Sequence, residues 1–147
     1  MPITINGSGS IGGINVGGLP DGVITTDDLA ANAVTTPKLG TNEQSGLCKA
    51  WVNFNGTGTV AIRASYNVSS ITDNGTGDYT VNFTTALVDA NYSLSGSASL
   101  NTSSAAVPRI LAAAAVSGFS AGNCQIRTAD DIGNYNDCAA VCVAIFR

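Results

Sequence analysis

The sequence predicts a mainly β protein in which an extended glycine-rich N-terminal arm and short stem repeats precede an antiparallel β-sandwich. Hydrophobic residues form 44% of the chain and charged residues only 11%. Since Ala and Val supply much of the apolar share, the implied core is built from small, β-forming side chains. The length of 147 residues suits one ordinary domain plus an arm. We therefore divide the chain into an arm with stem repeats, residues 1–47, and a β-sandwich, residues 48–147.

The first twenty residues predict an arm that is ordered by a partner. Glycines alternate there with apolar anchors, and such a density of glycine weakens any isolated fold. The expected docking anchors are Ile3, Ile5, Ile11, Ile14, Val16 and Leu19.

A ten-residue repeat follows the arm, because the pattern of residues 23–29 recurs in residues 33–39. In each unit the second threonine is expected to cap a short helical turn, and Pro37 suits the first helical position. Ordering the backbone costs about 1–2 kcal/mol per residue, so a unit this short cannot stay ordered without cover for its anchors. We expect neighbouring copies of the chain to cover Ile24, Leu29, Val34 and Leu39. Residues 41–47 are expected to form a polar hinge.

Alternating side chains predict six to eight strands after the hinge. Residues 52–55 alternate first, and residues 60–68 then alternate with a strict period of two, which is typical of a half-buried strand with Val60 to Val68 facing inward. Residues 73–78, with Asn-Gly at their centre, predict a hairpin, after which Tyr79, Val81 and Phe83 face inward. Further strands are expected at residues 92–100, 109–116, 123–128 and 139–146.

Four cysteines allow two disulfides. If the last two strands pair across a loop centred near Asp131, Cys124 faces Cys138. Cys48 and Cys142 meet if the first and last strands are neighbours. The alternative for all four is a reduced cysteine that acts as a small hydrophobic residue. A zinc site ranks lower, because without histidine it would need all four thiolates.

Enzymatic chemistry is disfavoured. The chain has no histidine, which excludes Ser-His-Asp and Cys-His catalysis. The carboxylate pairs Asp27-Asp28 and Asp130-Asp131 are adjacent in sequence, whereas glycoside hydrolysis needs carboxylates that converge on one bond. We expect a non-enzymatic protein without cofactor or metal.

Charge and hydropathy also exclude two classes of partner. The six Lys and Arg residues are scattered and form no basic stripe, so nucleic-acid binding is disfavoured. The longest apolar run, residues 110–116, is too short to cross a bilayer. The first residues do not resemble a signal peptide, so we expect synthesis in a cytoplasm.

One loop has the composition of a sugar-contacting surface. Residues 129–136 form a polar tip with a single aromatic residue, and the candidate receptor-contacting residues are Asp130, Asp131, Asn134 and Tyr135. An ordinary hairpin tip explains the same composition equally well.

Two stretches of the chain resemble a known family. Residues 19–39 resemble the repeats of the trimeric stems of bacteriophage tail-fibre proteins. Residues 50–63 and 67–83 resemble the β-rich terminal domain of such fibres, and residues 143–147 also fit. The middle block, residues 50–83, is the specific part of the resemblance.

The resemblance implies a homotrimer on the surface of a phage particle. Its arm would dock on other virion proteins of the baseplate, tail or capsid, and its β domain would face outward, with a host cell-surface glycan as a candidate ligand. The family supplies no shared catalytic residues. Because the chain is short for a fibre, the alternative is a trimeric capsid cement or head-decoration protein, for which residues 1–47 would lie along the shell.

Overall fold

A computed structural model of the chain describes residues 24–100, 110–113 and 118–147. The chain divides into two compact units, residues 1–40 and 41–147. The predicted docking anchors lie outside the described residues: Ile3, Ile5, Ile11, Ile14, Val16 and Leu19.

The ten-residue repeat forms two equivalent 3₁₀ turns, η1 (Thr26–Asp28) and η2 (Thr36–Lys38). In η1 the amide of Asp28 donates to the carbonyl of Thr25 over 3.2 Å, and in η2 the amide of Lys38 donates to that of Thr35 over 2.8 Å. The residue before each turn is therefore the first threonine of the pair and not the second, and Pro37 is the second residue of its turn.

The apolar anchors of the repeat are largely uncovered within one chain. Ile24, Leu29 and Val34 are 53%, 46% and 55% exposed, and Leu39 is half-buried. This is the arrangement expected of a segment that cannot bury its own apolar side chains.

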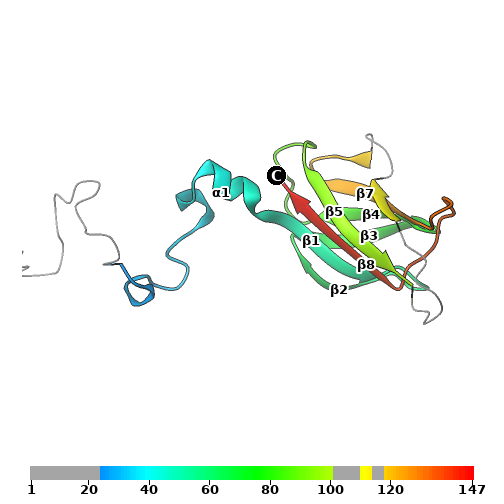
Figure 1. Ribbon diagram of the computed structural model, residues 1–147, viewed down its shortest axis with the longest axis horizontal. Helices are drawn as coiled ribbons and strands as arrows, with labels where there is room; N and C mark the ends of the chain where they lie inside the picture. The colour runs from blue at the N-terminus through cyan, green and yellow to red at the C-terminus, as the bar shows by residue number, and fades with distance from the viewer. Residues whose placement is uncertain (1–23, 101–109, 114–117) are drawn as a thin grey trace, which may run out of the picture. The chain divides into compact units, whose positions relative to one another are not determined.

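Residues 41–147 form two four-stranded antiparallel sheets (Figure 1). Sheet A has the order β2-β1-β8-β5, and sheet B has the order β3-β4-β7-β6. The strands are β1 (Cys48–Asn55), β2 (Ala61–Tyr66), β3 (Val68–Gly75), β4 (Asp78–Phe83), β5 (Ser93–Ser99), β6 (Ile110–Ala113), β7 (Asn123–Ala129) and β8 (Ala140–Phe146). The strands expected at residues 92–100, 123–128 and 139–146 correspond to β5, β7 and β8, and β6 lies within the expected 109–116.

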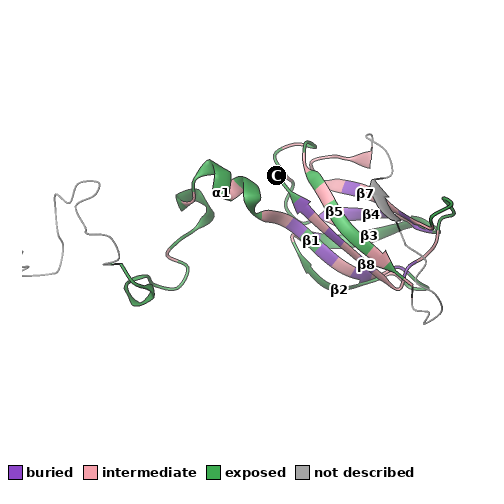
Figure 2. Cartoon of the chain, in the orientation of Figure 1, coloured by how far each residue is buried: buried purple, intermediate pink, exposed green. Residues whose placement is uncertain are grey.

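One buried core joins the two sheets. Inward side chains alternate along the central strands β1, β8, β4 and β7, so that purple and pink bands follow one another in Figure 2. The rings of Phe54 from sheet A and Tyr79 from sheet B meet edge to face with centroids 5.2 Å apart. The core residues are Ala50, Val52, Phe54, Val68, Tyr79, Val81, Phe83, Cys124, Ile126, Cys138, Val141, Val143 and Ile145.

The prediction of a half-buried strand at residues 60–68 is confirmed only at its ends, where Val68 is buried and Val60 packs against the core; it is wrong for β2, all six residues of which are exposed. A bulge at Arg63 is the cause: Asn53 of β1 pairs with Ala64, but the next residue, Phe54, pairs with Ile62. The extra residue moves the alternating side chains to the opposite face of the sheet. As a result Ala64 and Tyr66 face outward, and Ile62 lies on the inner side at an open edge, 36% exposed.

The predicted hairpin is present, but its turn lies later than expected. β3 and β4 pair from Val68 opposite Phe83 to Gly75 opposite Asp78, so Thr76 and Gly77 form the turn. Gly77 has φ +64°, which glycine tolerates better than other residues.

Residues 41–46 form a short helix where the sequence suggested a hinge. Within α1 (Thr41–Gly46) the hydroxyl of Ser45 donates to the carbonyl of Thr41 over 2.7 Å. The ammonium of Lys49 in β1 donates to the carbonyl of Gln44 over 2.5 Å and ties the helix to sheet A.

Neither predicted disulfide forms, and the registers explain why. Cys124 lies on β7 in sheet B and pairs with Val81, whereas Cys138 precedes β8 in sheet A. β1 and β8 are neighbours, which was the condition for the second bridge, but Cys48 pairs with Phe146 and Cys142 with Asn53. Burial raises the pKa of the Cys124 thiol to about 12, so this cysteine acts as a small core residue.

Two isoleucine substitutions test which strands face the core. Ile126→Ala removes a fully buried side chain and should lower the free energy of unfolding by about 2–5 kcal/mol. Ile62→Ala, on β2, should lower it by less than about 1 kcal/mol because its side chain already meets solvent. Urea denaturation of the full chain measures both, and equal losses would show that β2 is covered within the chain.

Candidate functional site

Three loops meet at one end of the two sheets, where the predicted receptor-contacting residues lie. They are the β1–β2 loop, the β3–β4 turn and the segment that carries the chain from β7 in sheet B to β8 in sheet A. The amide of Gly56 donates to the carbonyl of Cys138 over 2.9 Å. The amide of Thr128 donates to the carbonyl of Gly77 over 2.8 Å. These bonds hold the three loops together as one surface, which we call the loop end.

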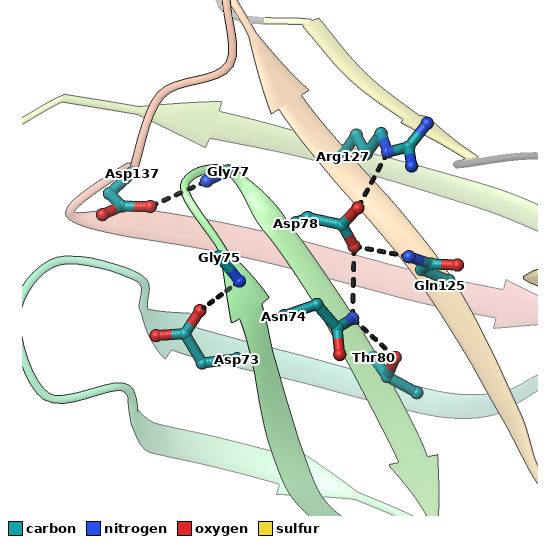
Figure 3. A network of polar contacts seen from close by, with 9 residues as sticks. All are labelled: Asp73, Asn74, Gly75, Gly77, Asp78, Thr80, Gln125, Arg127 and Asp137. Atoms are coloured by element: carbon teal, nitrogen blue, oxygen red, sulfur yellow. Dashed lines mark hydrogen bonds and ion pairs between the residues drawn. The ribbon is translucent and has the colours of Figure 1, made fainter.

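Gly77 makes the closest contact within the loop end. A Cβ atom at this position would lie 2.5 Å from the carbonyl oxygen of Thr128 and 2.7 Å from the amide nitrogen of Asn136. The amide of Gly77 also donates to Oδ1 of Asp137 over 2.7 Å, on the same segment (Figure 3). A side chain at residue 77 would therefore displace the backbone of the β7–β8 segment where it crosses between the sheets.

The Tyr79 hydroxyl connects the core to the loop end. Its ring is fully buried, and its oxygen lies 2.9 Å from both the carbonyl of Gly56 and Oδ1 of Asp137. Burial and the neighbouring Asp137 carboxylate raise the pKa of Tyr79 far above its usual 10. The hydroxyl therefore remains protonated and serves as a donor that fixes the loops.

Asp78 is the centre of a polar cluster on the outer face of sheet B (Figure 3). Its carboxylate accepts hydrogen bonds from Arg127 Nε over 2.9 Å, from Gln125 Nε2 over 2.6 Å and from Asn74 Nδ2 over 3.2 Å. Partial burial alone would raise the pKa of Asp78, but the bonds from Gln125, Arg127 and Asn74 outweigh it and hold the pKa below its usual value. The cluster joins β3, β4 and β7.

Two of the four predicted loop residues are used to shape the loop itself. The amides of Ile132 and Asn134 donate to Oδ1 of Asp130 over 3.2 and 2.7 Å, and Asn134 Nδ2 donates to Oδ2 over 3.1 Å. Asp130 and Asn134 therefore form an Asx-type turn.

The other two predicted residues, Asp131 and Tyr135, are exposed. The guanidinium of Arg127 lies over the Tyr135 ring, 5.2 Å from its centroid. Sequence reasoning missed Arg127, although its outward position on β7, alternating with buried Ile126 and Thr128, was a usable signal.

The loop end thus presents an aromatic ring, a guanidinium and a carboxylate on a hydrogen-bonded base. Such groups recognise a ligand by stacking and hydrogen bonding. Among the residues that the structure describes, no three metal-ligating side chains come together. No helix in the described part of the chain is long and apolar enough to cross a membrane.

Comparison with known protein families, with curated proteins and with solved structures gives no match for this chain.

Two glycine substitutions test the close contact in the loop end. Gly77→Ala should lower the free energy of unfolding by several kcal/mol, because the new Cβ displaces the Thr128 and Asn136 backbone. Gly58→Ala is the matched control, since Gly58 has φ +61° but nothing within 4 Å of its Cβ position. It should cost about 1–2 kcal/mol from backbone strain alone. Similar losses in urea denaturation of both variants would mean that the Gly77 contact is unimportant.

The Asp78 cluster predicts a specific dependence of stability on pH. Because the folded pKa of Asp78 lies below the usual 3.8, its stabilising effect is complete above that pH and is lost as the pH falls through the folded value. The stability difference between the unmodified chain and Asp78→Asn should therefore be largest near neutral pH and shrink below pH 3.8. Asp131→Asn, on the exposed loop, is the control. A difference that grows on acidification would contradict the assignment.

Proposed function

We propose that this chain is a non-enzymatic structural protein of a bacteriophage virion. In this proposal the chain forms a short trimeric tail fibre. Its N-terminal arm anchors the fibre to other virion proteins, and its β domain contacts the host surface. The main supporting observation is the contrast between the two units. The repeat leaves Ile24, Leu29 and Val34 exposed, whereas residues 41–147 bury a core of their own.

The exposed anchors supply a driving force for joining copies. Covering an aliphatic side chain that would otherwise meet water contributes about 1.5–3 kcal/mol. Because the four anchors are already about half covered, they contribute only about 3–6 kcal/mol per chain, while association costs about 4–15 kcal/mol in lost freedom of motion. The gain from the repeats alone is therefore at or below the cost of association, and a further contact between copies is expected.

The loop end is the proposed host contact. Tyr135 and Arg127 offer a stacking surface, and the exposed Asp131 of the same loop offers hydrogen-bond acceptors. Carbohydrate hydroxyls and ring faces match these groups, so a cell-surface glycan is the ligand class that the loop end favours.

A trimeric capsid cement or head-decoration protein is the second candidate. It is favoured by the shortness of the stem, because the described part of unit 1 contains only two 3₁₀ turns. A decoration protein needs no more stem than this to register neighbouring copies.

Imaging of labelled particles tests the proposal and separates the two candidates. Antibody raised against residues 41–147 should mark the tail of the phage, whereas marks at capsid threefold positions would favour the decoration protein. An absence of label from purified particles would contradict both.

Truncation supplies the matched control for anchoring. A chain of residues 41–147 should fold, because these residues form one compact unit with its own core, but it should not attach to particles that lack the protein. The full chain should attach under the same conditions. Attachment of the truncated chain would show that the arm is not the anchor.

A further inference from the structure

The structure describes two Asn-Gly pairs, at residues 55–56 and 74–75, and both are followed by a threonine. A third pair, at residues 6–7, lies outside the described residues. In such a pair the backbone nitrogen of the glycine can attack the side-chain carbonyl carbon of the asparagine, because glycine has no side chain to hinder the approach. The product is a cyclic imide, which water opens to aspartate or isoaspartate. Since the two described pairs share this local chemistry, their surroundings decide where it proceeds.

The surroundings of Asn55 and Gly56 oppose the reaction. Gly56 is buried, and its amide donates to the carbonyl of Cys138 over 2.9 Å. A backbone carbonyl accepts this hydrogen bond but does not take up the proton. The Asn55 side chain is held as well, because its Nδ2 donates to the carbonyl of Thr57 over 2.6 Å and its Oδ1 accepts from the Thr57 hydroxyl over 2.9 Å. Attack requires both groups to leave these partners.

The second pair lies at a bulge in β3. Asp73 pairs with Tyr79 and Gly75 pairs with Asp78, so Asn74 is the extra residue of the bulge. Asn74 and Gly75 are both exposed, and nothing lies within 4 Å of the position that a Cβ atom of Gly75 would occupy. Water therefore reaches this pair, and the neighbouring atoms leave space beside the attacking nitrogen.

A carboxylate is positioned at the nucleophile of this second pair. The Gly75 amide donates to Oδ1 of Asp73 over 3.0 Å (Figure 3). A general base needs to lie about 2.6–3.2 Å from the atom whose proton it removes, and Asp73 meets this requirement. A carboxylate can also hold the proton, whereas the carbonyl that faces the Gly56 amide cannot.

We propose that Asn74 is a self-modification site of the folded protein, at which Asp73 removes the Gly75 amide proton and Asn74 is deamidated. The Gly75 nitrogen forms a bond to Cγ of Asn74, and the bond from Cγ to Nδ2 breaks. Nδ2 leaves as ammonia with the proton that Asp73 passes on through water. A water molecule then adds to one of the two imide carbonyls and opens the ring. The reaction goes beyond the proposed virion role and does not depend on it.

Deamidation of Asn74 changes the Asp78 cluster. Nδ2 of Asn74 donates to Oδ1 of Asp78 over 3.2 Å and to Oγ1 of Thr80 over 2.9 Å. An ionised aspartate at residue 74 has no hydrogen to donate, and it adds a second negative charge beside Asp78. The cluster that joins β3, β4 and β7 therefore loses two hydrogen bonds and gains a repulsion each time the reaction occurs.

Peptide mapping by mass spectrometry follows the pairs separately while the folded full chain is incubated in neutral buffer. Asn74 should deamidate at least about tenfold faster than Asn55, because Asn55 reacts only when its surroundings open. In guanidinium chloride, where the fold no longer distinguishes the two pairs, their rates should agree within about threefold.

Asp73→Asn tests the base. An amide oxygen at this position still accepts the Gly75 hydrogen bond but does not take up the proton. The rate at Asn74 in the folded chain should therefore fall by at least about tenfold. Asp131→Asn removes an exposed carboxylate of another loop and is the matched control, which should leave the rate at Asn74 unchanged.

Two results would overturn the proposal. If Asn74 reacts no faster than Asn55 in the folded chain, the fold does not select this site. If Asp73→Asn leaves the rate at Asn74 unchanged, the carboxylate orders the bulge and is not the base. If Asp73→Asn does not fold, the comparison of Asn55 with Asn74 in the unmodified chain still decides the site.

Discussion

The passage of the chain from β7 in sheet B to β8 in sheet A depends on the missing side chain of Gly77. With its Cβ position 2.5 Å from the Thr128 carbonyl, Gly77 lets the hairpin turn lie directly against the crossing segment. The crossing makes β8 a neighbour of β1, and it positions Asp137 beneath the Tyr79 hydroxyl. The close contact of the Gly77 backbone with Thr128 and Asn136 therefore shapes the loop end at the point where the chain passes between the sheets.

Local patterns in the sequence predicted the strands well and their arrangement poorly. Alternation identified β4 and its inward residues Tyr79, Val81 and Phe83, because a pattern of period two is a property of the strand itself. It failed at β2, since the bulge at Arg63 is defined by pairing with β1 and not by the residues of β2 alone. The same reasoning explains the predicted Cys124 to Cys138 bridge: adjacent strands in sequence suggested pairing, but they lie in different sheets.

The candidate site was predictable to a similar degree. Composition located the loop of Asp130 and Tyr135, because glycine, asparagine and aspartate mark turns in any fold. It did not reveal that the Asp130 carboxylate accepts hydrogen bonds from the Ile132 and Asn134 amides, nor that the Arg127 guanidinium lies over the Tyr135 ring. These contacts depend on which strands become neighbours. The Asp78 cluster also depends on strand pairing, because it joins β3, β4 and β7.

The account assigns different tasks to two parts of the chain, the repeats with exposed anchors and the polar loop end. Its central claim is that the repeats bring three copies together. Native mass spectrometry of the full chain tests this claim most directly, since it counts the copies in one particle. The account predicts a species of three times the chain mass of 14.7 kDa. A dominant species of a single chain mass, at concentrations where the protein is fully folded, would contradict it.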